Sequence, residues 1–170
     1  MAVLPLTKIP DPLLLAVSLP VETIDDDIRV FAHDMLDTMY KSGGVGIAAV
    51  QVGKLLRITA IDVNYRDGER KPLIAINPEI VASSEEQSSY DEGCLSVGPY
   101  RSSVSRPARI TVSYTDLEGE KHQIEADGIL ATCFQHEIDH MDGVLFFDHL
   151  TKEQRQEILD QVAAEQTSVA

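Results

Sequence analysis

The pentapeptide His136-Glu137-Ile138-Asp139-His140 restricts the possible folds of this chain more than any other segment. On a helix, positions i and i+4 lie on one face about one turn apart, so two imidazoles at this spacing can hold one divalent cation. Glu137 follows the first histidine and is placed to take a proton from an attacking water. Apolar residues occupy the preceding turns. The pattern therefore predicts a central, largely buried helix that carries a metal site.

A catalytic metal needs a third protein ligand, and downstream candidates are limited. The metzincin pattern continues through Gly143 but puts Phe146 at its third ligand position, and phenylalanine cannot coordinate a metal. Glu157, 17 residues after His140, is a suitable type of ligand, and His149 is a weaker candidate in a predicted loop. A site completed by Glu157 would be that of a metallopeptidase cutting internal peptide bonds.

The two cysteines are the upstream candidates. Cys133 shares the helix with the histidines, but Cys133 to His140 spans about 10.5 Å of helix axis at 1.5 Å per residue, too far for one tetrahedral site. We interpret Cys133 as a small apolar wall beside the metal. Cys94 lies in another element and can approach to complete a Cys-His-His set, with one position left for water. Its thiolate would suit Fe(II) or Zn(II) better than Mg(II) or Ca(II).

Strands in the middle of the chain and helices towards its two ends predict an α+β fold. We expect antiparallel or mixed sheets around a central helix that carries the pentapeptide, with an N-terminal and a C-terminal helix beside them. The first helix is expected to start at Thr23 as N-cap and to close at Gly43 and Gly44. The central helix runs from Asp127 to about Met141, and the last from a Thr151 capping box to about Glu165. Expected strands are 55–63, 73–81, 109–115 and 121–125, with a polar surface turn at Ser83–Ser89. We predict a single domain over 1–170, with 166–170 as a frayed tail.

Charge and cysteine content exclude several other classes. With 14 Lys and Arg against 28 Asp and Glu, the formal charge is −14, which disfavours nucleic-acid binding and docking on anionic membranes. The sequence has neither a run of about 20 apolar residues nor an evident signal or transit peptide. Two cysteines do not make a disulfide framework, so we expect free thiols in a reducing cytoplasm.

Three segments together resemble the peptide deformylases. They are Gly44-Val45-Gly46-Ile47-Ala48-Ala49-Val50-Gln51, Glu92-Gly93-Cys94-Leu95-Ser96 and Gln135-His136-Glu137-Ile138-Asp139-His140, the last continued by Asp142-Gly143. Any one of these motifs is weak or moderate, whereas all three in this order are highly specific and span nearly the whole chain. The resemblance implies a metal-dependent hydrolase that removes the formyl group from the N-terminal formyl-methionine of new polypeptides and releases formate. It places the chain in protein biosynthesis and N-terminal methionine processing.

The resemblance also implies roles for individual residues. Cys94, His136 and His140 would bind one divalent metal ion, natively Fe(II), with Zn(II), Ni(II) or Co(II) as substitutes. Glu137 would be the acid/base, and Gln51 with the backbone N–H of Leu95 would stabilise the oxyanion. Arg106 would pair with Glu92. The residues expected to bind substrate are Val45, Gly46, Glu92, Arg101, Ile129 and Cys133. Formyl-methionyl nascent peptides and the ribosome near its exit tunnel would be the partners of a monomeric, bacterial-type cytoplasmic enzyme.

The chain departs from the family at Gly98-Pro99, where the order of proline and glycine that is usual after the second motif is reversed. An expected loop at Tyr100–Ser103, which carries Arg101, follows this dipeptide. Met141 replaces the usual leucine, a nearly isosteric change. Two other interpretations are weaker. A phosphate loop at Gly43–Gly46 lacks the following Lys-Ser/Thr and the strand-to-helix setting. A non-catalytic binding module would not need Glu137.

Overall fold

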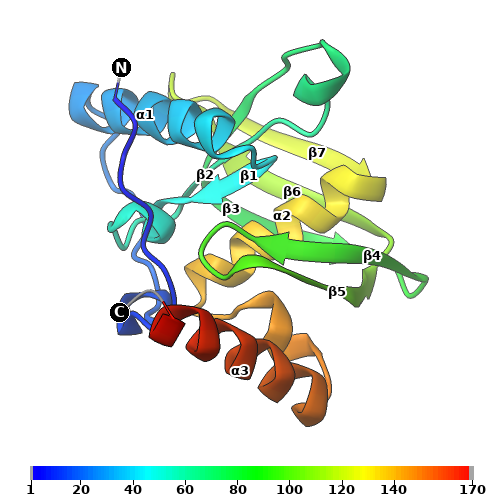
Figure 1. The fold of residues 1–170 in the computed structure, drawn as a ribbon. Helices are drawn as coiled ribbons and strands as arrows, with labels where there is room; N and C mark the ends of the chain where they lie inside the picture. Colours follow the sequence, from blue (N-terminus) through cyan, green and yellow to red (C-terminus); the bar gives the residue numbers. More distant parts are fainter. Residues whose placement is uncertain (1, 169–170) are drawn as a thin grey trace.

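Two antiparallel sheets enclose one helix in the computed structural model, which describes residues 2–168 (Figure 1). The larger sheet has the strand order β1-β2-β3-β6-β7, and β4 pairs with β5 in the smaller one. The strands are β1 (Gly46–Ala48), β2 (Ile58–Ile61), β3 (Leu73–Ser83), β4 (Gln87–Cys94), β5 (Gly98–Pro107), β6 (Arg109–Thr115) and β7 (Lys121–Asp127). This is the expected α+β architecture.

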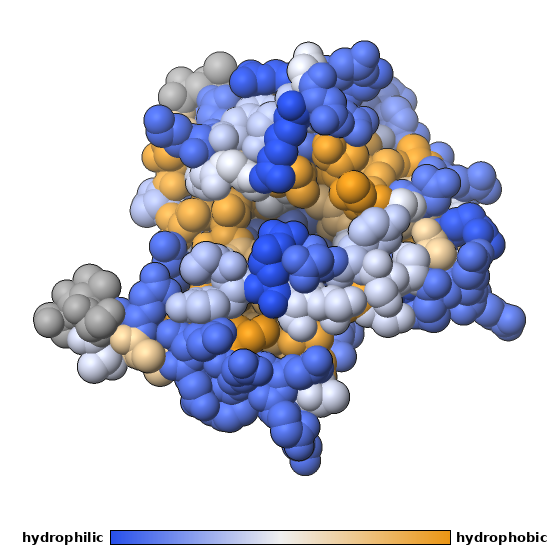
Figure 2. Space-filling view, turned by 45° about the vertical axis from the view of Figure 1, so that its right-hand side comes forward, coloured by the Kyte–Doolittle hydropathy of each residue, from blue (hydrophilic) through white to orange (hydrophobic). Residues whose placement is uncertain are grey.

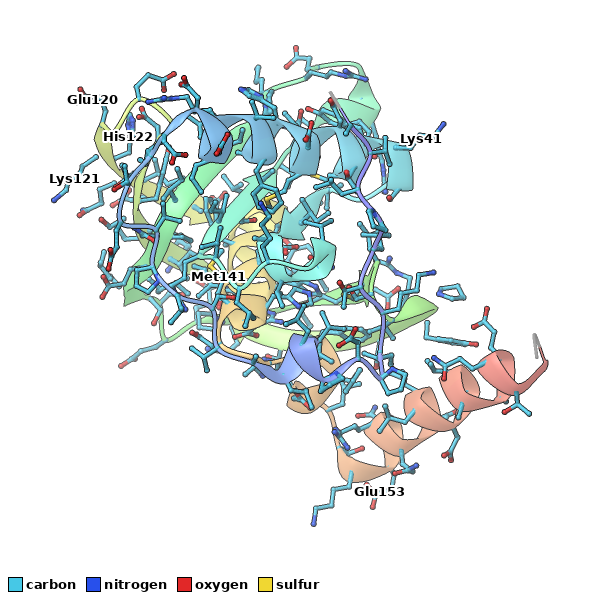
Figure 3. The ribbon with its side chains drawn as sticks, turned by 90° about the vertical axis from the view of Figure 1, so that its left-hand side faces the viewer. Lys41, Glu120, Lys121, His122, Met141 and Glu153 are labelled. Atoms are coloured by element: carbon cyan, nitrogen blue, oxygen red, sulfur yellow. The ribbon has the colours of Figure 1, made fainter. Side chains whose placement is uncertain are left out.

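Helix α2 (Gly128–Met141) is the central element and contacts strands of both sheets (Figure 1). Ten of its fourteen residues are buried, including both histidines of the pentapeptide, because protein covers it on more than one side. Met141, labelled in Figure 3, ends the helix in the interior with no exposed surface. The predicted bounds of this helix are confirmed.

Helix α1 (Asp26–Ser42) packs against β1 and β2. Its apolar stripe is buried through Phe31, Met35 and Met39. Gly43 closes it in the left-handed conformation at φ 76°, as expected. The predicted N-cap at Thr23 is wrong, since Asp25 accepts the hydrogen bond from the backbone N–H of Ile28 at 2.9 Å. A carboxylate two residues further on thus takes the capping position.

The β4–β5 hairpin is the main element that the sequence patterns did not predict. The expected surface turn at Ser83–Ser89 is reduced to residues 84–86, because β3 extends to Ser83 and β4 begins at Gln87. The expected loop at Tyr100–Ser103 is part of β5, paired with β4 in a register that puts Arg101 opposite Gly93. Serine-rich, polar strands carry no hydrophobic alternation, so their pairing is visible only in the tertiary structure.

Helix α3 (Lys152–Ser168) closes the chain on the other side of the hairpin from α1 (Figure 1). The predicted capping box is confirmed: Gln154 N–H donates to the Thr151 hydroxyl, and Thr151 N–H donates to the Gln154 side chain, both at 3.2 Å. The helix continues past Glu165 to Ser168, and Gln166 donates to the Ile9 carbonyl of the N-terminal arm at 2.8 Å. The helix thus includes residues 166–168 of the tail that was expected to fray, and residues 169–170 lie outside the described part of the chain.

Within residues 2–168, none of the helices has an apolar stretch that would let it cross a bilayer.

Candidate active site

Cys94, His136 and His140, here called the ligand cluster, offer one ligand atom each within 4.8 Å of one another. Cys94 is the last residue of β4, and the two histidines lie one turn apart on α2. The Cys94 Sγ atom lies 3.3 Å from Nε2 of His140. The smaller sheet therefore brings a thiol onto the histidine face of the central helix, 42 residues along the chain from the first histidine.

His136 is oriented by a buried network of charged side chains. Its Nδ1 lies 2.9 Å from Oε1 of Glu92, which leaves Nε2 for the cluster. Glu92 in turn accepts two hydrogen bonds from Arg106, from Nε at 2.7 Å and from Nη2 at 3.0 Å. Both partners are only 5% exposed, so the pair is sheltered from water. Arg106 also donates to Asp139 at 2.8 Å, tying the network back to α2.

The two histidines differ in their affinity for protons. Burial, followed by the neighbouring charges of His136 and Arg106, holds the pKa of His140 well below its ordinary value. For His136 burial acts in the same direction, but hydrogen bonds with Cys94 and Glu92 outweigh it and raise the pKa well above normal. His140 is thus neutral and available as a ligand. His136 holds a proton more tightly, so a metal ion that binds to it has to displace that proton.

The residues present fit a divalent transition metal. One thiol and two imidazoles are a donor set that suits Fe(II) or Zn(II), and three protein ligands leave a position open. Cys133 is not part of the cluster, since its Sγ contacts the Val45 carbonyl at 3.8 Å. Burial and the charges of Glu137 and Glu92 raise the pKa of the Cys133 thiol, which keeps it neutral.

Glu137 lies beside the cluster in an apolar setting. It is 3% exposed, and its Oε2 has no hydrogen-bond partner among the described residues. Burial, partly offset by the charge of His136, raises its pKa to about 7. A Cβ placed on Gly46 would lie 2.7 Å from Oε1 of Glu137 and 2.6 Å from Sγ of Cys133. Only glycine therefore lets strand β1 approach the carboxylate so closely.

Gln51 presents its amide N–H groups to the same region. Its Oε1 accepts a hydrogen bond from Ala48 N–H at 2.9 Å, which orients the side chain. Its Nε2 donates to the Ser96 hydroxyl at 3.2 Å and lies 3.5 Å from Sγ of Cys94. Sulfur is a weak hydrogen-bond acceptor, so an oxyanion near the cluster could replace it.

A cleft of about 580 Å³ runs over the ligand cluster between β1 and β4. Figure 2 shows hydrophobic side chains gathered above a hollow on this face of the molecule. His140 lies beneath it and is fully buried. The predicted site residues that line it are Val45, Gly46, Gln51, Glu92, Cys94, Leu95, Arg101, Ile129, Cys133, His136 and Glu137.

Arg101 lies at the rim of this cleft. Its side chain crosses the backbone of Gly93 and donates to the Asp91 carboxylate at 3.1 Å and to the Asp91 carbonyl at 2.6 Å. It is therefore held on β4 and β5, although its position was expected to depend on a loop.

The two alternative third ligands lie elsewhere. Glu157 is exposed on α3 and does not join the histidines, which overturns the site expected of a metallopeptidase. His149 Nε2 lies 2.7 Å from Asp139 Oδ2 and is outside the cluster.

The cleft also has a wall that sequence reasoning missed. Val63, Arg66 and Asp67, from the connection between β2 and β3, line it opposite the hairpin. The Asp67-Gly68 pair in this segment is typical of a turn, which marks a change of direction and says nothing about where the loop folds.

Comparisons with known proteins all lead to one family. The family model described as "Polypeptide deformylase" matches residues 3–156. The chain is 53% identical over 159 residues to a "Peptide deformylase" of Rhizobium meliloti, covering 94% of this chain and 91% of that protein. It is 50% identical to one of Brucella suis, with the same coverage.

Solved structures lead to the same family. A peptide deformylase from Ehrlichia chaffeensis in complex with actinonin superposes with a TM-score of 0.91 at 41% identity, covering 97% of this chain and 98% of that one. One from Legionella pneumophila has a TM-score of 0.91 at 37% identity, covering 98% and 96%.

Proposed function

The chain belongs to the polypeptide deformylase family, and from this premise we propose that the ligand cluster is its metal site and Glu137 its acid/base. Its activity is the hydrolytic removal of the N-formyl group from nascent polypeptides. The observation that carries the assignment of roles is the convergence of one thiol and two imidazoles within 4.8 Å, beside a buried carboxylate.

Each protein group has a distinct task in this reaction. A metal ion bound there would lower the pKa of a water molecule at the open position from about 15.7 towards about 7. Glu137 takes the proton of the attacking water and later delivers it to the leaving nitrogen of the methionine. Gln51 and the N–H of Leu95 donate hydrogen bonds to the oxygen on which negative charge develops.

The cleft residues would hold the rest of the peptide. The cleft is flanked by Val45 and Gly46, at the start of the edge strand β1, and by the end of β4 near Glu92. An extended peptide can therefore pair between them as an added strand. Ile129 and Cys133 would contact the methionine side chain, and Arg101 at the rim would lie near later residues of the peptide.

We propose Fe(II) as the native ion, with Zn(II), Ni(II) or Co(II) as substitutes, because the thiolate makes the site soft. Cys94 has to stay reduced to act as a ligand, which supports a cytoplasmic location. We also propose that the protein acts as a monomer and meets its substrate near the ribosomal exit tunnel. The charge of −14 disfavours contact with ribosomal RNA, so the nascent peptide would supply the main attraction. Metal analysis after anaerobic purification, gel filtration and co-sedimentation with ribosomes test these points.

Glu137→Gln tests the central assignment. The amide keeps the shape of the side chain but cannot accept the proton of water, so formate release from formyl-Met-Ala-Ser should fall at least about 100-fold with the metal content unchanged. Retained turnover in this variant, or internal cleavage of peptides by the wild type, would contradict the proposal.

A further inference from the structure

The connection between β2 and β3, residues 62–72, forms the wall of the cleft opposite the β4–β5 hairpin; we call it the cleft loop. Its Val63, Arg66 and Asp67 line the cleft. The loop has only a short 3-10 turn, Tyr65–Asp67, and much of it is exposed. Something outside the loop must therefore hold it in place.

Asp62 closes the cleft loop at its base. The residue is 1% exposed, and its Oδ2 accepts hydrogen bonds from the Tyr40 hydroxyl at 2.6 Å and from the backbone N–H of Lys71 at 3.0 Å. Because Asp62 and Lys71 lie at opposite ends of the loop, one carboxylate oxygen joins the two ends. The backbone N–H of Asp62 also donates to the Val45 carbonyl at 2.9 Å, so the same residue is joined to the segment just before β1, which also lines the cleft.

Tyr40 anchors this arrangement to α1. It lies in the last turn of the helix, next to Lys41, which Figure 3 labels at the C-terminal end of α1. The rings of Tyr40 and Tyr65 pack in a T-shaped arrangement with 4.9 Å between centroids, and the guanidinium of Arg70 lies 4.4 Å from the Tyr40 centroid. Burial and the Asp62 carboxylate raise the pKa of the Tyr40 hydroxyl, which keeps it a donor at physiological pH.

A second contact joins α1 to the middle of the loop. Arg66 donates a hydrogen bond from Nη2 to the carbonyl of Gly43, directly after α1. The end of α1 thus holds the cleft loop at its base through Asp62, on its faces through Tyr65 and Arg70, and at its tip through Arg66. Tyr40 is the single tyrosine of α1, and its hydroxyl donates to the Asp62 carboxylate.

We propose that Tyr40 and Asp62 are positioning residues for substrate binding: their hydrogen bond holds the cleft loop against the cleft, so that the peptide meets a formed wall. Neither residue contacts the ligand cluster or Glu137 through any hydrogen bond or ring contact among residues 2–168. The pair should therefore act on binding and leave the chemical step alone. The inference rests on the cleft being the peptide site.

Tyr40→Phe tests the inference, because it removes one hydroxyl and keeps the ring. Without the Tyr40–Asp62 hydrogen bond, only a fraction of the molecules should have the cleft loop in place. The apparent Kd for the peptide then equals the intrinsic Kd divided by that fraction. We expect KM for formyl-Met-Ala-Ser to rise roughly 5- to 20-fold, with kcat within about twofold of wild type and unchanged metal content. Hydrogen exchange at the Lys71 amide should become faster in the same variant.

The matched control is Tyr100→Phe. Tyr100 also donates its hydroxyl to a carboxylate, Glu165 at 2.9 Å, but does so outside the cleft. It should leave KM and Lys71 exchange unchanged. An unchanged KM in Tyr40→Phe overturns the inference, as does a fall in kcat with loss of metal, which would indicate general damage. A wild-type protein that releases no formate would instead contradict the proposed function.

Discussion

Glu92 joins His136 to Arg106: its Oε1 lies 2.9 Å from Nδ1 of the histidine, and both of its oxygens accept hydrogen bonds from the guanidinium. Burial alone would raise the pKa of Glu92, but the hydrogen bonds from His136 and Arg106 outweigh it and lower the pKa. The carboxylate is therefore charged. It fixes the orientation of a proposed metal ligand from outside the metal site.

Glu92→Gln should weaken metal binding about 10- to 100-fold, because the amide cannot pair with both His136 and Arg106. The buried Arg106 would keep Asp139 as its only carboxylate partner, so the free energy of unfolding should also fall, by about 1.5–3 kcal/mol. Metal titration and thermal unfolding measure the two effects. Glu86→Gln is the control: its pair with Arg109 at 2.6 Å is well exposed, so stability should change by less than about 1 kcal/mol. Equal effects in the two variants would contradict the role of Glu92.

Gln51→Ala should reduce kcat by about 100- to 1000-fold, equivalent to about 2.7–4 kcal/mol of barrier, since a donor to the oxyanion is lost. Metal content should stay at the wild-type level. Steady-state assays of formate release provide the measurement. Gln156→Ala is the control, because the Gln156 side chain donates to Asp160 on exposed α3, away from the cleft. Unchanged turnover would remove Gln51 from the mechanism.

Cys94→Ala should abolish metal binding, whereas Glu157→Ala should leave the metal content unchanged. Removal of the thiol leaves two imidazoles, which do not form a catalytic site, so the protein should lose its metal and its activity. Removal of the exposed Glu157 carboxylate should change neither. Metal content per chain, measured after anaerobic purification, distinguishes them. Metal loss in Glu157→Ala alone would restore the metallopeptidase interpretation.

Gly46→Ala should impair catalysis because the added Cβ would lie 2.6 Å from Sγ of Cys133 and 2.7 Å from Oε1 of Glu137. Neither neighbour can move freely in a buried site, so we expect about 1–3 kcal/mol of destabilisation and a displaced Glu137. Gly44→Ala is the comparison, since its Cβ would meet the side-chain end of Leu95 at 2.8 Å. Thermal unfolding and kcat should both be affected more by Gly46→Ala, and the reverse order would count against this packing.

The helices were predictable because their signals are local. The periodic apolar residues of α1, the Thr151 capping box and the pentapeptide on α2 depend on neighbours within one or two turns. The β4–β5 hairpin was not predictable, since its strands are polar and their pairing depends on distant contacts. The cap at Asp25 was missed for a smaller reason: Thr23 and Asp25 are both good N-cap residues, so residue type alone does not distinguish them.

The sequence by itself determined the chemistry of the site: two histidines and a glutamate at helical spacing, a thiol in a second motif, and a glutamine in a third, in an order that resembles one family. Only the tertiary structure decided that Cys94 rather than Glu157 meets the histidines, that Asp139 joins the expected pair of Arg106 and Glu92, and that Asp62 holds the wall of the cleft. Helical spacing is set by the backbone within a few residues, whereas these contacts join residues dozens of positions apart, and only the packing of the two sheets around α2 brings them together.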